Sequence, residues 1–217
     1  MAVRRRQTPV ISLRKNPRQA RSAQLVKLIL EAAIRVLARE GARRFTTARV
    51  ADEAGISVGS LYQYFPNKEA ILFRLQMQEW AQTGELLTRI LRDAAQPPLE
   101  RLRTAVKAFL HSECDEAELR TALGDAAPLY RDAEETIQHR KQGKKRSAVF
   151  MKEVLPQATA TTRTLAADVV MTTLSSVGKA ISETARSRAE VDAFAEAMSD
   201  MFAAYLQRLA QASSQDD

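Results

Sequence analysis

The chain has 217 residues, of which 45% are hydrophobic and 27% charged, and its formal net charge is +7. The one cysteine, Cys114, excludes an internal disulfide and suits a reducing compartment. No apolar run approaches the ~20 residues of a membrane-spanning helix, and the basic start lacks the apolar part of a secretion signal, so we expect a cytoplasmic protein without a membrane partner.

Basic charge is concentrated in the first third of the chain. Residues 1–74 hold 15 of the 33 basic and 5 of the 26 acidic side chains. The remainder of the chain therefore holds 18 basic and 21 acidic side chains. Because a cation that neutralises a phosphate releases counterions, this asymmetry favours a nucleic-acid partner for the N-terminal third. We expect residues 1–16 to form a basic disordered arm that either contacts DNA, with insertion into the minor groove as the most specific form, or binds anionic lipid, or only aids solubility.

The first predicted helix has an apolar stripe and a glycine stop. Its stripe consists of Leu25, Ile29, Ala32, Ala33, Val36 and Leu37. Gly41 is expected to end it as the residue after the C-cap. Arg43 and Arg44 follow in the connector, where either a phosphate contact or plain solvation is open.

Residues 45–65 have the spacing of two short helices joined by a tight turn. Val50, Ala51 and Ala54 lie on one face of the first helix, and Gly55 can take the positive φ of the turn. Ser57 can cap the second helix. On that helix Val58, Leu61 and Tyr64 are predicted to face inward, while Gly59, Ser60, Tyr62 and Gln63 remain outside.

The outer face of the second helix is small, polar and free of acidic residues, so it can lie in the major groove of DNA. The threonines at 46 and 47 open the preceding helix with free amides, which suit a phosphate, and Lys68 can neutralise another. We therefore predict a recognition helix over 58–65. The expected DNA-binding set comprises Arg43, Arg44, Thr46, Thr47, Ser57, Val58, Gly59, Ser60, Tyr62, Gln63, Tyr64 and Lys68. A pair of core helices joined by a glycine turn is the alternative.

The run TTARVADEAGISVGSLYQYFPNKEAIL resembles the DNA-binding domain of the TetR family of bacterial transcriptional repressors, and ILEAAIRVLAREG resembles that family's first helix. The resemblance spans about Arg18 to Leu75. It implies an all-α fold with a three-helix helix-turn-helix domain (17–66) and a C-terminal ligand-binding and dimerisation domain (67–217). It also implies a homodimeric repressor that a small-molecule effector releases from a palindromic operator on double-stranded DNA. By the same resemblance, the DNA-contacting positions include Thr47, Ser57, Gly59, Ser60, Tyr62, Tyr64 and Lys68.

The rest of the chain is predicted to be helical throughout. Asn67 can cap a helix that runs to about Ala95, and a long helix is expected from about Pro128 to Leu155. Ser187 and Glu190 have the spacing of a capping box at the start of the last helix. Two apolar stripes on the last two helices either form a four-helix dimer interface or close the core of the monomer. The interface residues are Leu165, Val169, Thr173, Val177, Ile181, Phe194, Met198, Phe202 and Tyr205.

Recognisable catalytic groups are missing from the sequence, which has two histidines, no phosphate-binding glycine loop and no His-x-x-x-His pair. We expect no enzyme, no cofactor and no metal, although His111, Glu113 and Cys114 lie close enough in sequence for a metal or redox sensor to be considered. Apolar and aromatic residues on the middle helices are candidates either for an effector pocket or for ordinary packing. They are Trp80, Phe109, His111, Tyr130, Phe150, Met151 and Met171. A DNA-binding regulator without a ligand and a helical dimeric interaction protein are the alternative functions.

Overall fold

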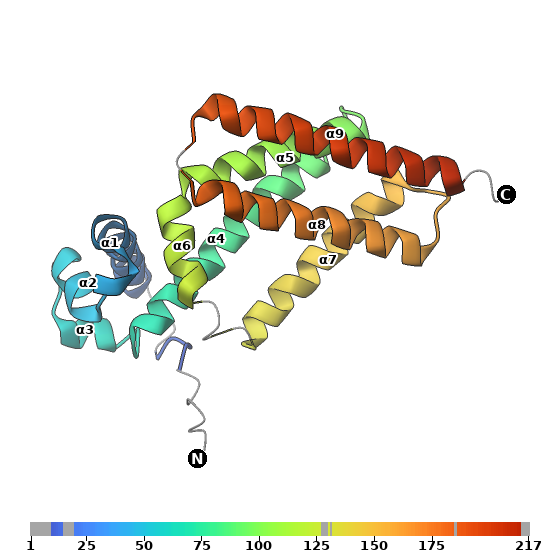
Figure 1. The fold of residues 1–217 in the computed structure, drawn as a ribbon. Helices are drawn as coiled ribbons and strands as arrows, with labels where there is room; N and C mark the ends of the chain where they lie inside the picture. The colour runs from blue at the N-terminus through green and yellow to red at the C-terminus, as the bar shows by residue number, and fades with distance from the viewer. Residues whose placement is uncertain (1–9, 15–19, 127–129, 131, 185, 214–217) are drawn as a thin grey trace, which may run out of the picture. The chain divides into compact units, whose positions relative to one another are not determined.

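The computed structural model describes residues 10–14, 20–126, 130, 132–184 and 186–213, and within these ranges every regular element is an α-helix (Figure 1). This confirms the predicted all-α fold. The chain divides into two compact units, one made of Met1–Trp80 and Glu118–Ile137 and the other of Ala81–Ala117 and Gln138–Asp217. The expected boundary between residues 66 and 67 differs from this division, because part of the next helix and a later segment belong to the first unit.

The helices of the first unit begin and end where local chemistry requires. They are α1 (Ala20–Arg44), α2 (Thr47–Glu53), α3 (Val58–Tyr62), the first part of α4 (Lys68–Leu91) and nearly all of α6 (Ala117–Ala126). Gly41 was predicted to end the helix; it has φ 70° and is non-helical, but α1 continues beyond it to Arg44. Asn67 caps α4, since its Oδ1 accepts from the Ala70 backbone N–H at 2.8 Å. The Gly41 conformation and the Asn67 cap both depend only on residues close in sequence.

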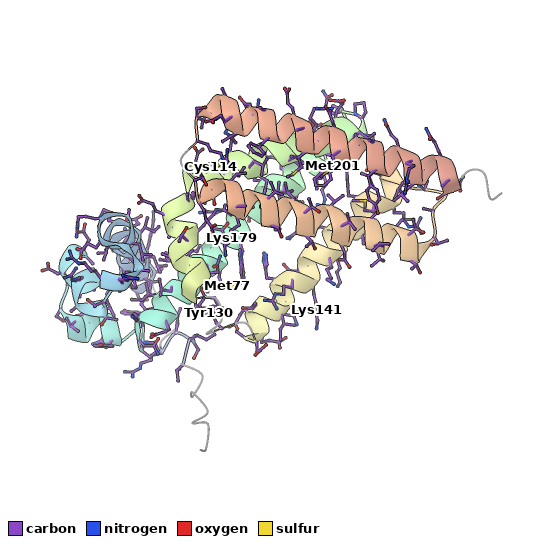
Figure 2. The ribbon with its side chains drawn as sticks, in the orientation of Figure 1. Met77, Cys114, Tyr130, Lys141, Lys179 and Met201 are labelled. Atoms are coloured by element: carbon purple, nitrogen blue, oxygen red, sulfur yellow. The ribbon has the colours of Figure 1, made fainter. Side chains whose placement is uncertain are left out.

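The core of the first unit is formed by α1 to α4 together with residues around Tyr130. Phe45, Leu61 and Phe65 are at most 1% exposed. Tyr130, labelled in Figure 2, is 1% exposed, and its ring lies 5.0 Å from that of Phe73. Because the Tyr130 hydroxyl donates to the Leu123 carbonyl at 3.1 Å, the buried phenol has a hydrogen-bond partner.

The second unit is a bundle of long helices. Its helices are the end of α4, α5 (Pro98–Asp115), most of α7 (Glu134–Val154), α8 (Ala160–Ser182) and α9 (Arg188–Ser213). Helix α5 packs against both α8 and α9, which lie side by side in Figure 1. The packing is close at Gly178, where an added Cβ would lie 2.7 Å from Cε1 of Phe109. A small residue is therefore required at this position of α8.

Two predicted helix boundaries in the body differ from the structure. Helix α4 ends at Leu91 instead of Ala95, because the Arg101 guanidinium donates to the Leu91 carbonyl at 2.6 Å and satisfies the helix end there. Helix α7 starts at Glu134, whereas Pro128 lies outside the described residues. The capping box is confirmed: Ser187 N–H donates to Glu190 Oε2 at 2.8 Å, and Glu190 N–H donates to Ser187 Oγ at 3.3 Å.

Within the described ranges, none of the helices combines the length and apolar character that crossing a bilayer requires.

Candidate nucleic-acid interface

The turn between α2 and α3 fixes the orientation of the two helices. Gly55 has φ 67°, a left-handed conformation that glycine adopts without steric cost. The Ile56 N–H donates to the Ala51 carbonyl at 3.0 Å and closes the turn, and Ala51 itself is 1% exposed. The predictions that Ala51 lies on the inner face of the first short helix and that Gly55 takes the positive φ of the turn are confirmed.

Side-chain caps start both short helices. Thr46 Oγ1 accepts from the Arg49 N–H at 3.3 Å, and Ser57 Oγ accepts from the Ser60 N–H at 3.0 Å. A helix of a few residues gains little from its own hydrogen bonds, so the caps and the burial of Leu61 hold α3 in place.

The surface of this region carries most of the residues predicted to meet DNA. Thr47 and Ser60 are half-buried, whereas nine others are exposed, namely Arg43, Arg44, Thr46, Ser57, Val58, Gly59, Tyr62, Gln63 and Lys68. Two side chains differ from their predicted orientation. Val58 was predicted to face inward but is 39% exposed, because it is rotated by about 60° from Leu61 around the helix and begins the first turn. Tyr64 is 6% exposed and packs in the core, so we remove it from the DNA-facing set.

Hydroxyl pairs hold the polar side chains of the exposed face. The Tyr62 hydroxyl lies 3.0 Å from Thr47 Oγ1, which joins the end of α3 to the start of α2. The Ser57 and Ser60 hydroxyls lie 2.8 Å apart. Each hydroxyl keeps a further donor or acceptor for an outside partner. The face therefore offers oriented hydrogen-bonding groups with little rotamer entropy left to lose on binding.

Two glutamates near this surface are paired with arginines. Glu53, at the end of α2, receives hydrogen bonds from Arg35 at 2.7 Å and Arg39 at 2.8 Å, and these bonds lower the pKa of its carboxyl. Glu40 pairs with Arg39 and Arg49. Residues 58–63 contain no acidic side chain. A polyanion therefore meets no uncompensated carboxylate on α3.

A contact that the sequence analysis missed lies between the N-terminal segment and the end of α3. Residues 10–14 were expected to be disordered, but the Arg14 N–H donates to the Tyr64 carbonyl at 2.9 Å and Asn67 Nδ2 donates to the Val10 carbonyl at 3.0 Å. Ile11 and Leu13 pack against the core of the first unit. The apolar residues at 10, 11 and 13, inside an otherwise basic stretch, were the signal for this packing.

The residues predicted for an effector pocket are divided between the two units. Tyr130 belongs to the core of the first unit, and Phe109, Phe150 and Met151 belong to that of the second. Trp80 and His111 are half-buried, and Met171 is 40% exposed. Instead, a pocket of about 310 Å³ in the second unit is lined by Pro97, Pro98, Leu99, Glu153, Val154, Leu206, Gln207 and Ala210. Its lining comes from helix ends, which hydrophobic periodicity does not identify.

The predicted dimer residues divide into core and surface. Ile181, Met198 and Phe202 are at most 6% exposed and pack inside the second unit, so their assignment to an exposed interface is corrected. Thr173, Val177 and Tyr205 are half-buried. Leu165, Val169 and Phe194 are 60%, 39% and 39% exposed. Met201, labelled in Figure 2, adds a further apolar side chain on α9 that is 51% exposed. Part of each stripe therefore closes the core of the second unit, and the remainder stays exposed on the single chain.

His111 and Cys114, which were considered for a metal or redox sensor, have local environments that account for them. His111 has a carboxylate partner, and Cys114 is partly buried. His111 Nε2 lies 2.8 Å from Asp192 Oδ1, and Lys107 contacts the same carboxylate at 2.9 Å. Burial raises the pKa of the Cys114 thiol, which disfavours the reactive thiolate. In the part of the chain that the structure describes, no group of three or more His, Cys, Asp or Glu side chains could hold a metal ion.

Comparison with family models gives two matches along the chain. Residues 29–75 match the model described as bacterial regulatory proteins, tetR family, and residues 97–209 match the model described as tetracyclin repressor-like, C-terminal domain. Together they cover the helices of the candidate interface and most of the second unit.

Individual proteins are similar to this chain over different lengths. The fatty acid metabolism regulator protein of Bacillus subtilis (strain 168) is 33% identical over 67 residues, which is 31% of this chain and 34% of that protein. The chain spans about a third or less of the length of the curated relatives it matches. Two solved structures share the fold more widely. A TetR-family regulator from Pectobacterium atrosepticum has a TM-score of 0.65 and 20% identity over 89% of this chain and 95% of that one. The fatty acid degradation regulator FadR from Bacillus halodurans has a TM-score of 0.63 and 17% identity over 87% and 95%.

Proposed function

Because the chain belongs to the TetR family of bacterial regulatory proteins, we propose that it is a transcriptional repressor that binds a palindromic operator on double-stranded DNA. The observation that carries this proposal is the exposed, acid-free face of α3, which Gly55 and Ser57 orient and Leu61 anchors. A face with these properties suits the major groove, where hydrogen-bonding side chains read base edges.

We assign proposed roles to most of the residues of this surface. Ser60, Tyr62 and Gln63 contact bases or the sugar edge, and Gly59 lets the helix approach closely. The amide end of α2 at Thr46 and Thr47 receives a phosphate, as helix N-termini do. Arg43, Arg44 and Lys68 neutralise further phosphates, which positions the protein without reading sequence.

A palindromic operator requires two copies of α3, so we propose a homodimer. Members of the TetR family dimerise, and the exposed apolar residues of α8 and α9 supply a surface with the character of a permanent interface in this chain. Leu165, Val169, Phe194 and Met201 are the proposed contacts. Sedimentation equilibrium of a Leu165→Lys, Met201→Lys double variant is expected to show a monomer, and a dimer of wild-type affinity would reject this surface.

We also propose that a small molecule controls DNA binding. The apolar pocket bounded by Leu99, Val154 and Leu206 has the volume of a small-ligand site and is the proposed effector site. Since two of the similar proteins are named as regulators of fatty acid metabolism or degradation, medium-chain fatty acids are the first compounds to test. Helix α4 contributes residues to both compact units, so it is the covalent path by which a bound ligand could shift the DNA-binding population.

The effector site is tested by filling the pocket. Decanoate is expected to raise the melting temperature of the wild type but not of Ala210→Trp, which places an indole at the pocket wall. Ala212→Trp, at an exposed position on the same helix, is the control and should respond as the wild type does. An Ala210→Trp variant that responds fully would place the ligand elsewhere.

The DNA-binding function is tested with genomic fragments that the purified protein retains. Electrophoretic binding of such a fragment at rising salt should weaken steeply for the wild type. A Tyr62→Ala, Lys68→Ala double variant should bind at least tenfold less well, because it loses a side chain at the groove and a phosphate contact. Unchanged binding by the double variant would remove α3 as the recognition helix.

Two alternatives remain distinguishable by these experiments. A regulator without a ligand would bind DNA but show no thermal response to any compound that fits the pocket. A helical dimeric interaction protein would dimerise and retain no DNA. We propose no catalytic role for the chain, and its place of action as a regulator of genes is the bacterial cytoplasm.

A further inference from the structure

The segment Val10–Arg14 is fixed to the end of the proposed recognition helix by its backbone. The Arg14 N–H donates to the Tyr64 carbonyl at 2.9 Å, and the Val10 carbonyl accepts from Asn67 Nδ2 at 3.0 Å. Between these bonds, Ile11 and Leu13 pack against the core of the first unit. The segment therefore has a defined course beside the turn that joins α3 to α4.

This course places the Arg14 guanidinium at the C-terminal end of α3. Its Nη1 lies 3.5 Å from the carbonyl of Tyr62, the last residue of the helix, and the side chain is exposed. A guanidinium has five N–H donors, so this one long contact leaves donors for another acceptor. Carbonyls at the end of a helix carry partial negative charge and would repel a phosphate, which a cation at that position prevents.

We propose that Arg14 binds a backbone phosphate of the operator next to the end of α3, as an additional DNA contact outside the helix-turn-helix. This inference rests on the proposed DNA-binding function. Tyr62 and Gln63 lie in the proposed groove-facing set, and a phosphate strand flanks any groove that a helix enters. The guanidinium suits that ligand, because its planar fork matches phosphate oxygens.

Because the main chain of Arg14 holds the segment in place, the Arg14 side chain can be replaced without releasing the segment. The bond from Arg14 to Tyr64 uses the main-chain N–H, which alanine retains, and Ile11 and Leu13 are unchanged in an Arg14→Ala variant. Such a variant removes the guanidinium alone. Arg14→Lys keeps the charge without the fork. Arg89→Ala removes one exposed arginine from the second unit and is the matched control.

Fluorescence anisotropy with a retained operator fragment, from about 50 to 300 mM salt, measures the contact. Arg14→Ala is expected to lower affinity roughly tenfold near physiological salt and to reduce the slope of log K against log salt by about 0.9 per protomer, or about 1.8 for a dimer. The same loss should occur on a scrambled duplex, because a phosphate contact carries no sequence information. Arg14→Lys should restore most of the slope, and Arg89→Ala should match the wild type.

A double-mutant cycle separates binding from anchoring. Leu13→Ser weakens the packing that holds the segment, so its loss of affinity should approach that of Arg14→Ala, and the double variant should lose little more. If Arg14→Ala changes only the melting temperature and leaves affinity and salt slope at wild-type values, Arg14 serves as a helix cap and the proposal is overturned. In that case the wild type still binds DNA, whereas failure of the wild type to bind would refute the proposed function itself.

Discussion

The two compact units differ in what makes a glycine necessary. Gly55 in the first unit has φ 67°, and an added Cβ there would meet no atom within 4 Å, so only the backbone conformation requires glycine. Gly178 in the second unit lies inside a helix, and its Cβ would lie 2.7 Å from the Phe109 ring, so only the packing requires it. Glycine therefore serves a turn at position 55 and a close contact between helices at position 178.

The largest expected effect comes from the buried side of α3. Leu61 is fully buried, and Leu61→Ala should lower the free energy of unfolding of the first unit by about 2–5 kcal/mol through lost burial and a cavity. Gln63→Ala, two positions on and exposed, should stay within about 0.5 kcal/mol. Chemical denaturation followed by circular dichroism measures both, and equal costs for the two variants would contradict the assigned orientation of α3.

The packing requirement at Gly178 is tested by one methyl group. Gly178→Ala should destabilise the second unit by about 1–3 kcal/mol, because the Phe109 ring has to move. Gly143→Ala is the control in the same unit: its Cβ would lie 4.0 Å from the nearest atom, Nη2 of Arg146, so helix propensity should make it stabilising by about 0.5–1 kcal/mol. Thermal unfolding should show shifts of opposite sign, and shifts of the same sign would refute the close contact.

Replacing Gly55, which is required for its backbone conformation, should lower stability less than replacing Gly178. Gly55→Ala should lower stability by about 1–2 kcal/mol, because a Cβ is strained at positive φ even where space is free. Gly55→Asn should cost less, since asparagine tolerates the left-handed region better. Wild-type stability in both variants would contradict the left-handed conformation of residue 55.

Only part of this architecture was predictable from sequence. Gly41 and Gly55 act through their own backbone conformation, and Asn67 and the Ser187–Glu190 pair act through hydrogen bonds to residues close in sequence. Local spacing was therefore sufficient to predict these turns and helix caps. Residue spacing was also sufficient to predict most of the exposed face of α3.

Burial on the long helices was not predictable in the same way. Met198 and Phe202 lie on the same apolar stripe as Phe194, yet the first two are buried in the core and the third is exposed. Periodicity identifies an apolar face but not how much of it the chain covers itself. The same limit applies to the effector candidates, because periodicity did not show that Tyr130 and Phe150 pack in separate cores.

The smallest expected effect concerns pH. Hydrogen bonds from Arg35 and Arg39 lower the pKa of Glu53 below its ordinary value of 4.5. A lowered pKa in the folded state stabilises the protein above pH 4.5, and this contribution is lost as pH falls through the folded value. Glu53→Gln should therefore melt slightly below the wild type at pH 7, and the gap should narrow toward pH 3.

The control for this comparison is Glu85→Gln, which removes one exposed carboxylate from the second unit. A gap between wild type and Glu53→Gln that stays constant from pH 7 to pH 3 would show that the two arginines do not stabilise the ionised carboxylate.

Gly59 offers the most direct test of DNA recognition by α3. It is exposed, and an added Cβ would lie 3.8 Å from Ser57 Oγ, so a side chain fits there without disturbing the fold. We predict that Gly59→Glu keeps the wild-type melting temperature but binds a retained operator fragment at least a hundredfold more weakly in an equilibrium titration, because it adds bulk at the groove and brings a carboxylate to the phosphates. Gly59→Gln adds the same bulk without the charge and should lose less affinity than Gly59→Glu. Wild-type affinity in the Gly59→Glu variant would contradict the account.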